Sequence, residues 1–461
     1  MEDALRIGIS TGLKLGATQV EAFASQTRTL HLAFEKKQVK RIEDRSDRGI
    51  GLRVLLVNNG TSSVGSSFTM STDRIAVEDA VHNALIVAKT KKPDTVALSF
   101  ETETKKRPAL PGLTDRKVKE TDENTAAVLA SRLIKTASED KRIRSVSGDI
   151  TFCYSQNFFL NSLGVIGQYD GTLFTATVWT TAKQAGSIGS AYDGFASRFL
   201  KPESAIDASR SAAETAISQL KPKAAKPGKA DVILGPEAME ALSASTLAFS
   251  LRADFVQKNQ SPLAGKIRQK IASTALRLED NPVLSGHAGS KPYDDEGHPT
   301  VRKMIIEKGE LLTYLHDHRT TMQEGGDKAG NALRVSTPDL MRKYIGEPQI
   351  LPHNLIIKPG KHSLDSLVSQ VKDGIYAKSL MGAHTANRVT GEFSVVPQMA
   401  YKITDGEIEY AIKDTVLSGS LLELLGNIRE VGHDPLHMLS ISGDSSFTAP
   451  PVLVEGLSIS G

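Results

Sequence analysis

Residues 235–255 read GPEAMEALSASTLAFSLRADF and follow the apolar run ADVIL at 230–234. The run predicts a strand, and the recurrence of Leu242, Leu247 and Leu251 predicts a buried helix directly after it. A helix that enters a core in this way is a place where a metal-dependent hydrolase can carry two histidines and a glutamate. The window 244–249 reads ASTLAF. None of these side chains binds zinc or transfers a proton at neutral pH.

Length and composition limit the classes of protein to which this chain can belong. A chain of 461 residues is too long for one hydrophobic core, so two or three domains are expected. The net charge of +3 comes from 56 basic and 53 acidic residues, a balance that gives no reason to expect nucleic-acid binding. Cys153 is the single cysteine, which excludes an intrachain disulfide and a cysteine-based zinc site.

The chain shows no sign of a membrane or an export segment. The first residues, MEDALRIGIS, lack a basic segment followed by an apolar run, so no signal peptide is expected. No apolar run approaches the roughly 20 residues that cross a bilayer. We therefore expect a cytoplasmic protein that has no contact with membranes.

Changes in pattern along the chain divide it into three parts, and the fold class is predicted to be α+β. Residues 1–94 predict a small α/β domain, and 95–227 predict a middle α+β domain that ends in the lysine- and proline-rich linker KPKAAKPGK at 221–229. Residues 228–461 predict a large, mainly β domain. Gly49 and Gly51 precede a strand and lack a third glycine, so a dinucleotide loop is not predicted there.

Several segments in the second half of the chain resemble the TldD/PmbA family. They are Asp254-Phe255, Ala264-Gly265-Lys266-Ile267, the segment 291–297 with sequence KPYDDEG, and the closing run 389–461. In the TldD branch of that family, a HExxxH helix before an Asp-Phe pair and a later cysteine supply the zinc site. The resemblance places those ligands at Ala244, Phe249 and Ser442, and the catalytic glutamate at Ser245.

The loss of all four side chains implies a PmbA (TldE)-like subunit, a modulator protein without a metal of its own. The resemblance further implies a heterodimeric zinc metallopeptidase that degrades or processes unfolded or extended peptides. Zinc and the HExxxH motif are then expected in a TldD-type partner subunit. This chain is expected to hold no cofactor and to be inactive in peptide hydrolysis alone.

Histidines elsewhere leave other functions open. His316 and His318 follow an apolar run, and strand alternation would place both imidazoles on one face, where a metal could bind them with His298 or His287. The pair His433 and His437 has HExxH spacing, but Pro435 interrupts a helix, and a turn with surface histidines is expected.

The acidic segment 293–297 predicts either a turn or a site for a cation or a peptide amino group. Two alternatives to the partner-subunit function therefore stay open. One is a stand-alone hydrolase that uses a histidine-rich site. The other is a non-enzymatic, peptide-binding homodimer.

Overall fold

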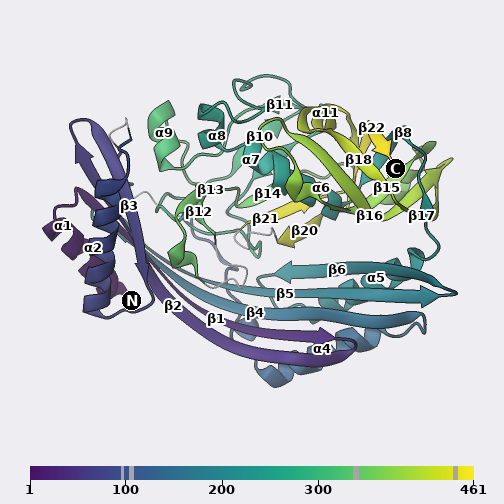
Figure 1. Cartoon of the computed structure of the whole chain (residues 1–461), viewed down its shortest axis with the longest axis horizontal. Helices are drawn as coiled ribbons and strands as arrows, with labels where there is room; N and C mark the ends of the chain where they lie inside the picture. The colour runs from purple at the N-terminus through teal and green to yellow at the C-terminus, as the bar shows by residue number, and fades with distance from the viewer. Residues whose placement is uncertain (95–97, 103–107, 336–341, 440–444) are drawn as a thin grey trace.

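A long curved sheet runs along one side of the molecule, and the C-terminal half packs against its inner side (Figure 1). The computed structural model describes residues 1–94, 98–102, 108–335, 342–439 and 445–461. The expected α+β class is confirmed, with a C-terminal half built mainly of strands. Among the described residues, no helix is both long and apolar enough to cross a bilayer.

The curved sheet has six antiparallel strands in the order β3-β2-β1-β4-β5-β6. Their bounds are β1 (Gln19–Glu35), β2 (Gln38–Asn58), β3 (Thr61–Thr69), β4 (Ile143–Asn161), β5 (Ile166–Gln184) and β6 (Ser187–Ser197). β1 and β4 pair from Glu21 opposite Asn161 to Phe34 opposite Gly148. The strands of residues 1–94 and 95–227 therefore form one continuous sheet.

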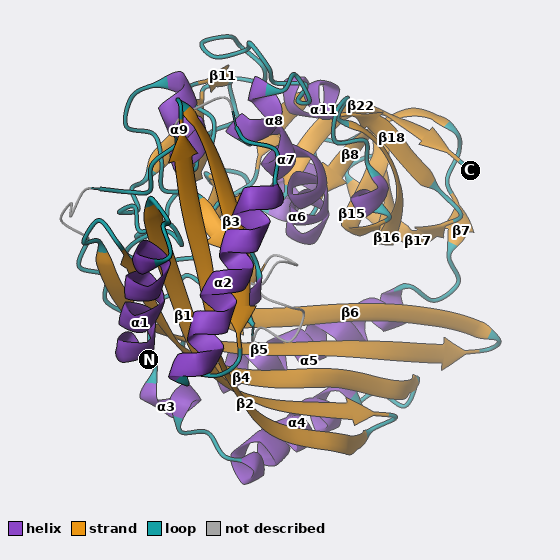
Figure 2. Cartoon of the chain, turned by 60° about the vertical axis from the view of Figure 1, so that its left-hand side comes forward, coloured by secondary structure: helices purple, strands orange, loops and turns teal. Residues whose placement is uncertain are grey.

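Two groups of helices cover the sheet at its two ends, α1 and α2 at one end and α4 and α5 at the other (Figure 2). The helices are α1 (Glu2–Lys14), α2 (Arg74–Thr90), α3 (Arg116–Lys119), α4 (Glu123–Ala137) and α5 (Pro202–Ser218). Alanine-rich faces let α2, α4 and α5 lie close to the sheet; α5 buries Ala205, Ala208, Ala212, Ala213 and Ala216. The result is a separate hydrophobic core at each end.

The described residues of the C-terminal half form three sheets. The largest has the order β15-β8-β22-β18-β16-β17-β7, with β19 paired to β22, and a further β15–β16 pairing closes five of its strands into a ring. The second has the order β11-β10-β9-β14-β21-β20, and β12 and β13 form the third. The strands of the largest sheet are β7 (Lys223–Ala224), β8 (Gly228–Leu234), β15 (Asp373–Met381), β16 (Glu392–Thr404), β17 (Glu407–Lys413), β18 (Val416–Ser420), β19 (Ile428–Val431) and β22 (Val452–Ser460).

The strands of the two smaller sheets are β9 (Leu278–Asp280), β10 (Lys303–Glu307), β11 (Glu310–Leu311), β12 (Ala332–Arg334), β13 (Pro348–Ile350), β14 (Asn354–Ile357), β20 (Leu436–Leu439) and β21 (Ser446–Ala449). The helices are α6 (Pro236–Leu242), α7 (Ala248–Ser250), α8 (Ala253–Gln257), α9 (His318–Glu324), α10 (Leu364–Val368) and α11 (Leu421–Gly426). One large core, which includes Leu234, Leu242 and Leu251, joins the ring of strands to α6, α8 and α11.

Two glycines of β2 allow the C-terminal half to dock against the curved sheet. A Cβ at Gly49 would lie 2.3 Å from the ring of Tyr344, and a Cβ at Gly51 would lie 2.3 Å from the carbonyl oxygen of Tyr344. Tyr344 is buried, and its hydroxyl donates to Asp47 at 2.7 Å. These glycines are therefore required for packing between the two halves of the molecule.

We predict that Gly51→Ala destabilises the protein by about 1–3 kcal/mol, because a backbone carbonyl cannot move aside as a side chain can. The measurement is the melting temperature of the purified variant. Gly426→Ala is the matched control, since that glycine lies in α11 and a Cβ added there would have no heavy atom of a residue outside its own helix within 4 Å among the described residues. The control should be neutral or slightly stabilising. Equal melting temperatures for Gly51→Ala and the parent would contradict the packing role.

Candidate functional site

The stretch 235–255 forms a strand-to-helix connection with a π-helical turn in its middle. β8 lies between β15 and β22, and α6 begins directly after it. The turn Ser243–Leu247 has π geometry, and the N–H of Ala248 donates to the carbonyl of Ser243, five residues earlier. In a π-helical turn, residues five apart are hydrogen-bonded across one turn, so Ala244 and Phe249 lie on nearly the same face.

The side chains on this turn and at Phe249 of the following helix α7 do not fit a zinc ion. Ala244 and Ser245 are half-buried, and so is Phe249, which forms an edge-to-face contact with Phe255 at 6.1 Å between ring centroids. The guanidinium of Arg388 lies 3.7 Å from the ring centroid of Phe249. A permanent positive charge at this position opposes a divalent cation. Ser442, the fourth position given by the resemblance, lies outside the described residues.

A cavity of about 810 Å³ lies between the curved sheet and the helix α6. On the sheet side, a cross-strand row of His31, Thr151, Thr175 and Ala196 forms its floor. On the opposite side its wall comes from Glu237, Glu240 and Ala241 of α6 and from Leu436, His437, Met438 and Leu439 of β20. β6 and β20 also line it, and each is the terminal strand of its sheet among the described strands.

Two carboxyl groups of α6 give the cavity its electrostatic character. Burial raises the pKa of Glu237 to about 7, although the nearby Lys378 acts in the opposite direction. Burial alone raises the pKa of Glu240 to about 7, and one of its carboxylate oxygens has no hydrogen-bond partner among the described residues. Lys378 lies 3.0 Å from Asp193 and 4.0 Å from Glu237. Glu240 is therefore a buried carboxyl group that can accept a ligand.

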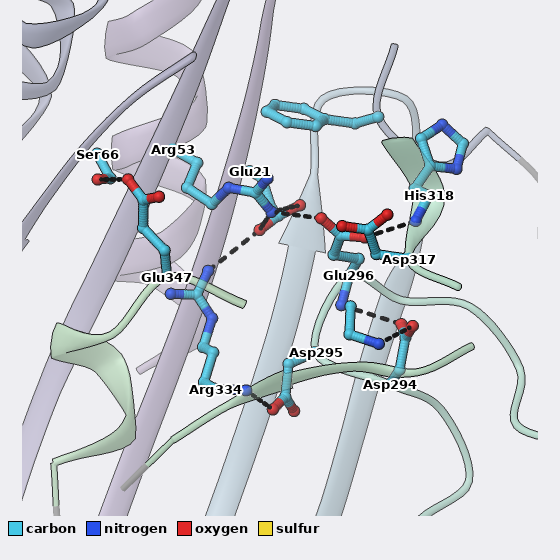
Figure 3. Close-up of polar contacts among 12 residues, drawn as sticks. Glu21, Arg53, Ser66, Asp294, Asp295, Glu296, Asp317, His318, Arg334 and Glu347 are labelled. Atoms are coloured by element: carbon cyan, nitrogen blue, oxygen red, sulfur yellow. Dashed lines mark hydrogen bonds and ion pairs between the residues drawn. The ribbon is translucent and has the colours of Figure 1, made fainter. Parts of the chain in front are cut away.

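A buried cluster of charges joins the curved sheet to the C-terminal half (Figure 3). Arg53 of β2 contacts Glu21 of β1 and Glu296, each at 3.1 Å. Arg334 contacts Glu21 at 3.2 Å, and its backbone N–H donates to Asp295 at 2.6 Å. Burial would raise the pKa of Glu296, but Arg53 and His318 hold it below its ordinary value.

The acidic segment 293–297 belongs to this cluster. The backbone N–H groups of Glu296 and His298 both donate to one carboxylate oxygen of Asp294 at 3.0 Å, which forms a tight turn. Asp295 pairs with Lys291 at 3.4 Å. Of the two alternatives that the sequence left open, the structure supports the turn, with the three acidic side chains buried and paired.

Of the three histidines of the alternative site, His298 and His318 lie together, and His316 makes a separate contact. Nε2 of His298 lies 2.7 Å from Nδ1 of His318, and Nδ1 of His298 contacts the carboxylate of Glu101. His316 is buried and pairs with Glu324 at 3.2 Å. The expected strand alternation of His316 and His318 is wrong, because Asp317 caps α9 and His318 begins that helix.

The pair His433 and His437 is also divided. His433 is exposed beside Asp434, as expected for a turn. His437 lies on β20, where its ring packs against His287 at 4.3 Å between centroids, and burial lowers its pKa to about 3. The expectation of two surface histidines is therefore correct for His433 and wrong for His437.

Sequence reasoning found the acidic segment 293–297 but missed other residues that give these sites their charge. Glu237 and Glu240 could have been found, since two acids three residues apart on a predicted buried helix are unusual. No sequence signal links Glu101 to His298, or Arg53 to Glu296, because the partners are separated by 197 or more positions.

Comparison with known proteins supports the assignment of a class. Models of the PmbA/TldA metallopeptidase family match in three consecutive segments: domain 1 at residues 20–88, the central domain at 115–220 and the C-terminal domain at 227–461. The chain therefore has the three-domain organisation that defines this family of proteins. The chain belongs to the PmbA/TldD family.

Individual relatives agree with this family. A metalloprotease of Methanothermobacter thermautotrophicus is 27% identical over 448 residues, which cover 94% of this chain and 91% of that protein. A PmbA homologue of Buchnera aphidicola, also called a metalloprotease, is 27% identical over 71% of this chain and 68% of its own length. TldE of Thermococcus kodakarensis shares the fold, with a TM-score of 0.87 at 24% identity over all of both chains.

We predict that Arg53→Ala destabilises the protein by about 3–5 kcal/mol, because it leaves Glu21 and Glu296 buried without their shared cation. Thermal and denaturant unfolding of the variant measure the loss. Arg74→Ala is the control, since its pair with Glu78 lies on the surface of α2 and contributes at most about 0.5 kcal/mol. A loss for Arg53→Ala no larger than for the control would show that the cluster does not stabilise the fold.

We predict that Glu240→Gln stabilises the protein at pH 8 and has no such effect near pH 4.5. The folded state raises the pKa of Glu240 to about 7 from an ordinary value of 4.5, so ionisation weakens folding progressively as pH rises through this window. The gain at pH 8 is up to about 3 kcal/mol. Glu237→Gln should increase the stability at pH 8 by a smaller amount, because this variant also loses the attraction between Glu237 and Lys378. Melting temperatures across pH 4.5–8 that are parallel for parent and Glu240→Gln would contradict this assignment.

Proposed function

We propose that this chain is the non-catalytic partner subunit of a TldD/TldE-type heterodimeric zinc metallopeptidase. The π-helical turn Ser243–Leu247 is the observation that carries the proposal. Its geometry places positions 244 and 249 on one face, the arrangement that a HExxxH pair requires. The side chains at these positions are alanine and phenylalanine, and a guanidinium lies against the second. The catalytic zinc then belongs to a TldD-type subunit that bears HExxxH.

The substrate that suits the cavity is an unfolded or extended peptide. Two terminal strands, β6 and β20, line the cavity, and terminal strands offer backbone donors and acceptors to an added strand. Backbone pairing gives affinity with little sequence preference. Hydroxyl groups of Thr151 and Thr175 on the floor suit a polar peptide backbone. This subunit would enclose the peptide while its partner supplies the chemistry.

The location proposed for this complex is the cytoplasm, where a single buried cysteine, Cys153, suits a reducing compartment. Homodimers of the chain alone are compatible with the proposal, provided that they exchange for the heterodimer when the partner is present.

We predict that the purified chain alone does not cleave an unfolded peptide, and that adding a HExxxH-bearing family member from the same genome produces cleavage. The reason is that a bound metal lowers the barrier for attack on an amide, and the turn at 243–247 offers it no ligand. The measurement is release of new peptide termini by the chain, by the partner and by the mixture. A partner whose HExxxH glutamate is changed to glutamine is the control and should leave the mixture inactive.

Co-purification of the two chains as a one-to-one complex should accompany the activity. Cleavage by the chain alone, resistant to chelators, would instead favour the stand-alone hydrolase. Peptide binding without any cleavage in the mixture would favour the non-enzymatic homodimer.

A further inference from the structure

Glu101, His298 and His318 come from three separate segments and meet in the interior. Glu101 follows the first domain, His298 follows the acidic turn, and His318 begins α9. One potential ligand atom from each lies within 4.8 Å of the other two, and this is the one group of this kind found among the described residues. Glu101 and His298 are buried, with 4% and 7% of their surface exposed.

The hydrogen bonds of this group leave one imidazole nitrogen unsatisfied. The carboxylate of Glu101 accepts from Nδ1 of His298, and Nε2 of His298 shares a proton with Nδ1 of His318 at 2.7 Å. Nε2 of His318 is buried and has no hydrogen-bond partner among the described residues. A buried polar atom without a partner is costly, so this nitrogen marks the small cavity that His318 lines as a place for a bound water molecule, beside the contact between the two rings.

The contact between Glu101 and His298 is one that orients a metal-binding imidazole. A carboxylate that holds the proton on Nδ1 leaves the lone pair of Nε2 available for a metal ion. Nδ1 of His318 faces that same nitrogen. Two zinc-bound nitrogens lie about 3.3 Å apart at ordinary bond lengths, so a small separation of the two rings would admit the ion.

The surroundings favour a cation and exclude a substrate. Glu101 and Glu296 both lie near His318, while the charge of Arg53 is shared between Glu21 and Glu296. The adjacent cavity, which Glu101 and His318 line, measures about 30 Å³. This volume holds one or two water molecules as further ligands and cannot admit a peptide.

We infer that His298 and His318, with Glu101 orienting the ring of His298, form a structural site for a divalent transition-metal ion, with zinc as the ion that suits imidazole ligands. The ion would fasten the segment 98–102 of the N-terminal half to the C-terminal half. This site is separate from the helix at 236–250 and would give the chain a metal, although the sequence led us to expect none. It does not depend on the proposed partner or peptide.

The test uses the full-length chain alone, dialysed against a chelator that is then removed. Titration with zinc chloride, followed by calorimetry, should show close to one equivalent bound per chain. Cobalt(II) should give visible absorption bands of a nitrogen- and oxygen-ligated ion. Zinc should also raise the melting temperature of the parent, because it binds the folded state.

Variants then locate the ion. His298→Ala and His318→Ala should each weaken zinc binding by about 100-fold or more, and Glu101→Gln by about 10–100-fold. His287→Ala is the matched control, because it removes one ring of the pair His287 and His437, which lies on the other cavity, and it should bind zinc as the parent does. Circular dichroism shows which variants fold.

Two outcomes would overturn the inference. One is a parent chain that takes up far less than one equivalent of zinc, a result that does not depend on the folding of any variant. The other is zinc binding that persists in a folded Glu101→Gln or His318→Ala variant at the affinity of the parent. Neither outcome touches the proposed function, whose test requires a partner subunit and a peptide.

Discussion

The contact of Arg53 with Glu21 and Glu296 is the interaction on which the arrangement of this molecule depends. Removing charges from water costs several kcal/mol for each ion, and the cost is recovered only where opposite charges meet at close range. Here Arg53 bridges a glutamate of its own sheet and a glutamate of the C-terminal half, and Arg334 returns from that half to Glu21. Hydrophobic packing alone would tolerate small rotations between the halves, whereas these fixed contacts do not.

Glutamate serves one purpose in the buried charge cluster and another in the wall of the cavity beside α6. Glu296 is surrounded by cations and backbone donors, so it stays ionised and holds the structure together. Glu240 lies in a cavity wall with no cation beside it among the described residues, so burial raises its pKa to about 7. A buried carboxyl group without a neighbouring cation is stabilised most by a ligand that brings a hydrogen-bond donor or a positive charge. The environment, rather than the side chain, separates the structural acid from the one available to a ligand.

In the helix after β8, the backbone has the geometry of a metal-binding turn but the side chains do not have the chemistry. The π-helical turn presents two positions five residues apart on one face, yet those positions carry Ala244 and Phe249. Meanwhile a histidine pair with a carboxylate lies elsewhere, in the interior between the two halves. The cavity beside α6 and the histidine group thus occupy different places in the fold. A metal ion bound at the histidine group would therefore affect the stability of the fold rather than the contents of that cavity.

The sequence by itself determined the fold class, the strand-to-helix connection at 235–255 and the absence of zinc ligands at 244–249, because these are local properties of period and residue type. It also led to the family through short segments such as Asp254-Phe255. Only the tertiary structure decided that the first two parts share one sheet, since the pairing of β1 with β4 joins residues 114 to 140 positions apart. It likewise decided that His318 meets His298 and Glu101 rather than His316, because the chain turns at Asp317. Local pattern carries no information on such contacts, which arise when distant segments are brought together by burial and charge.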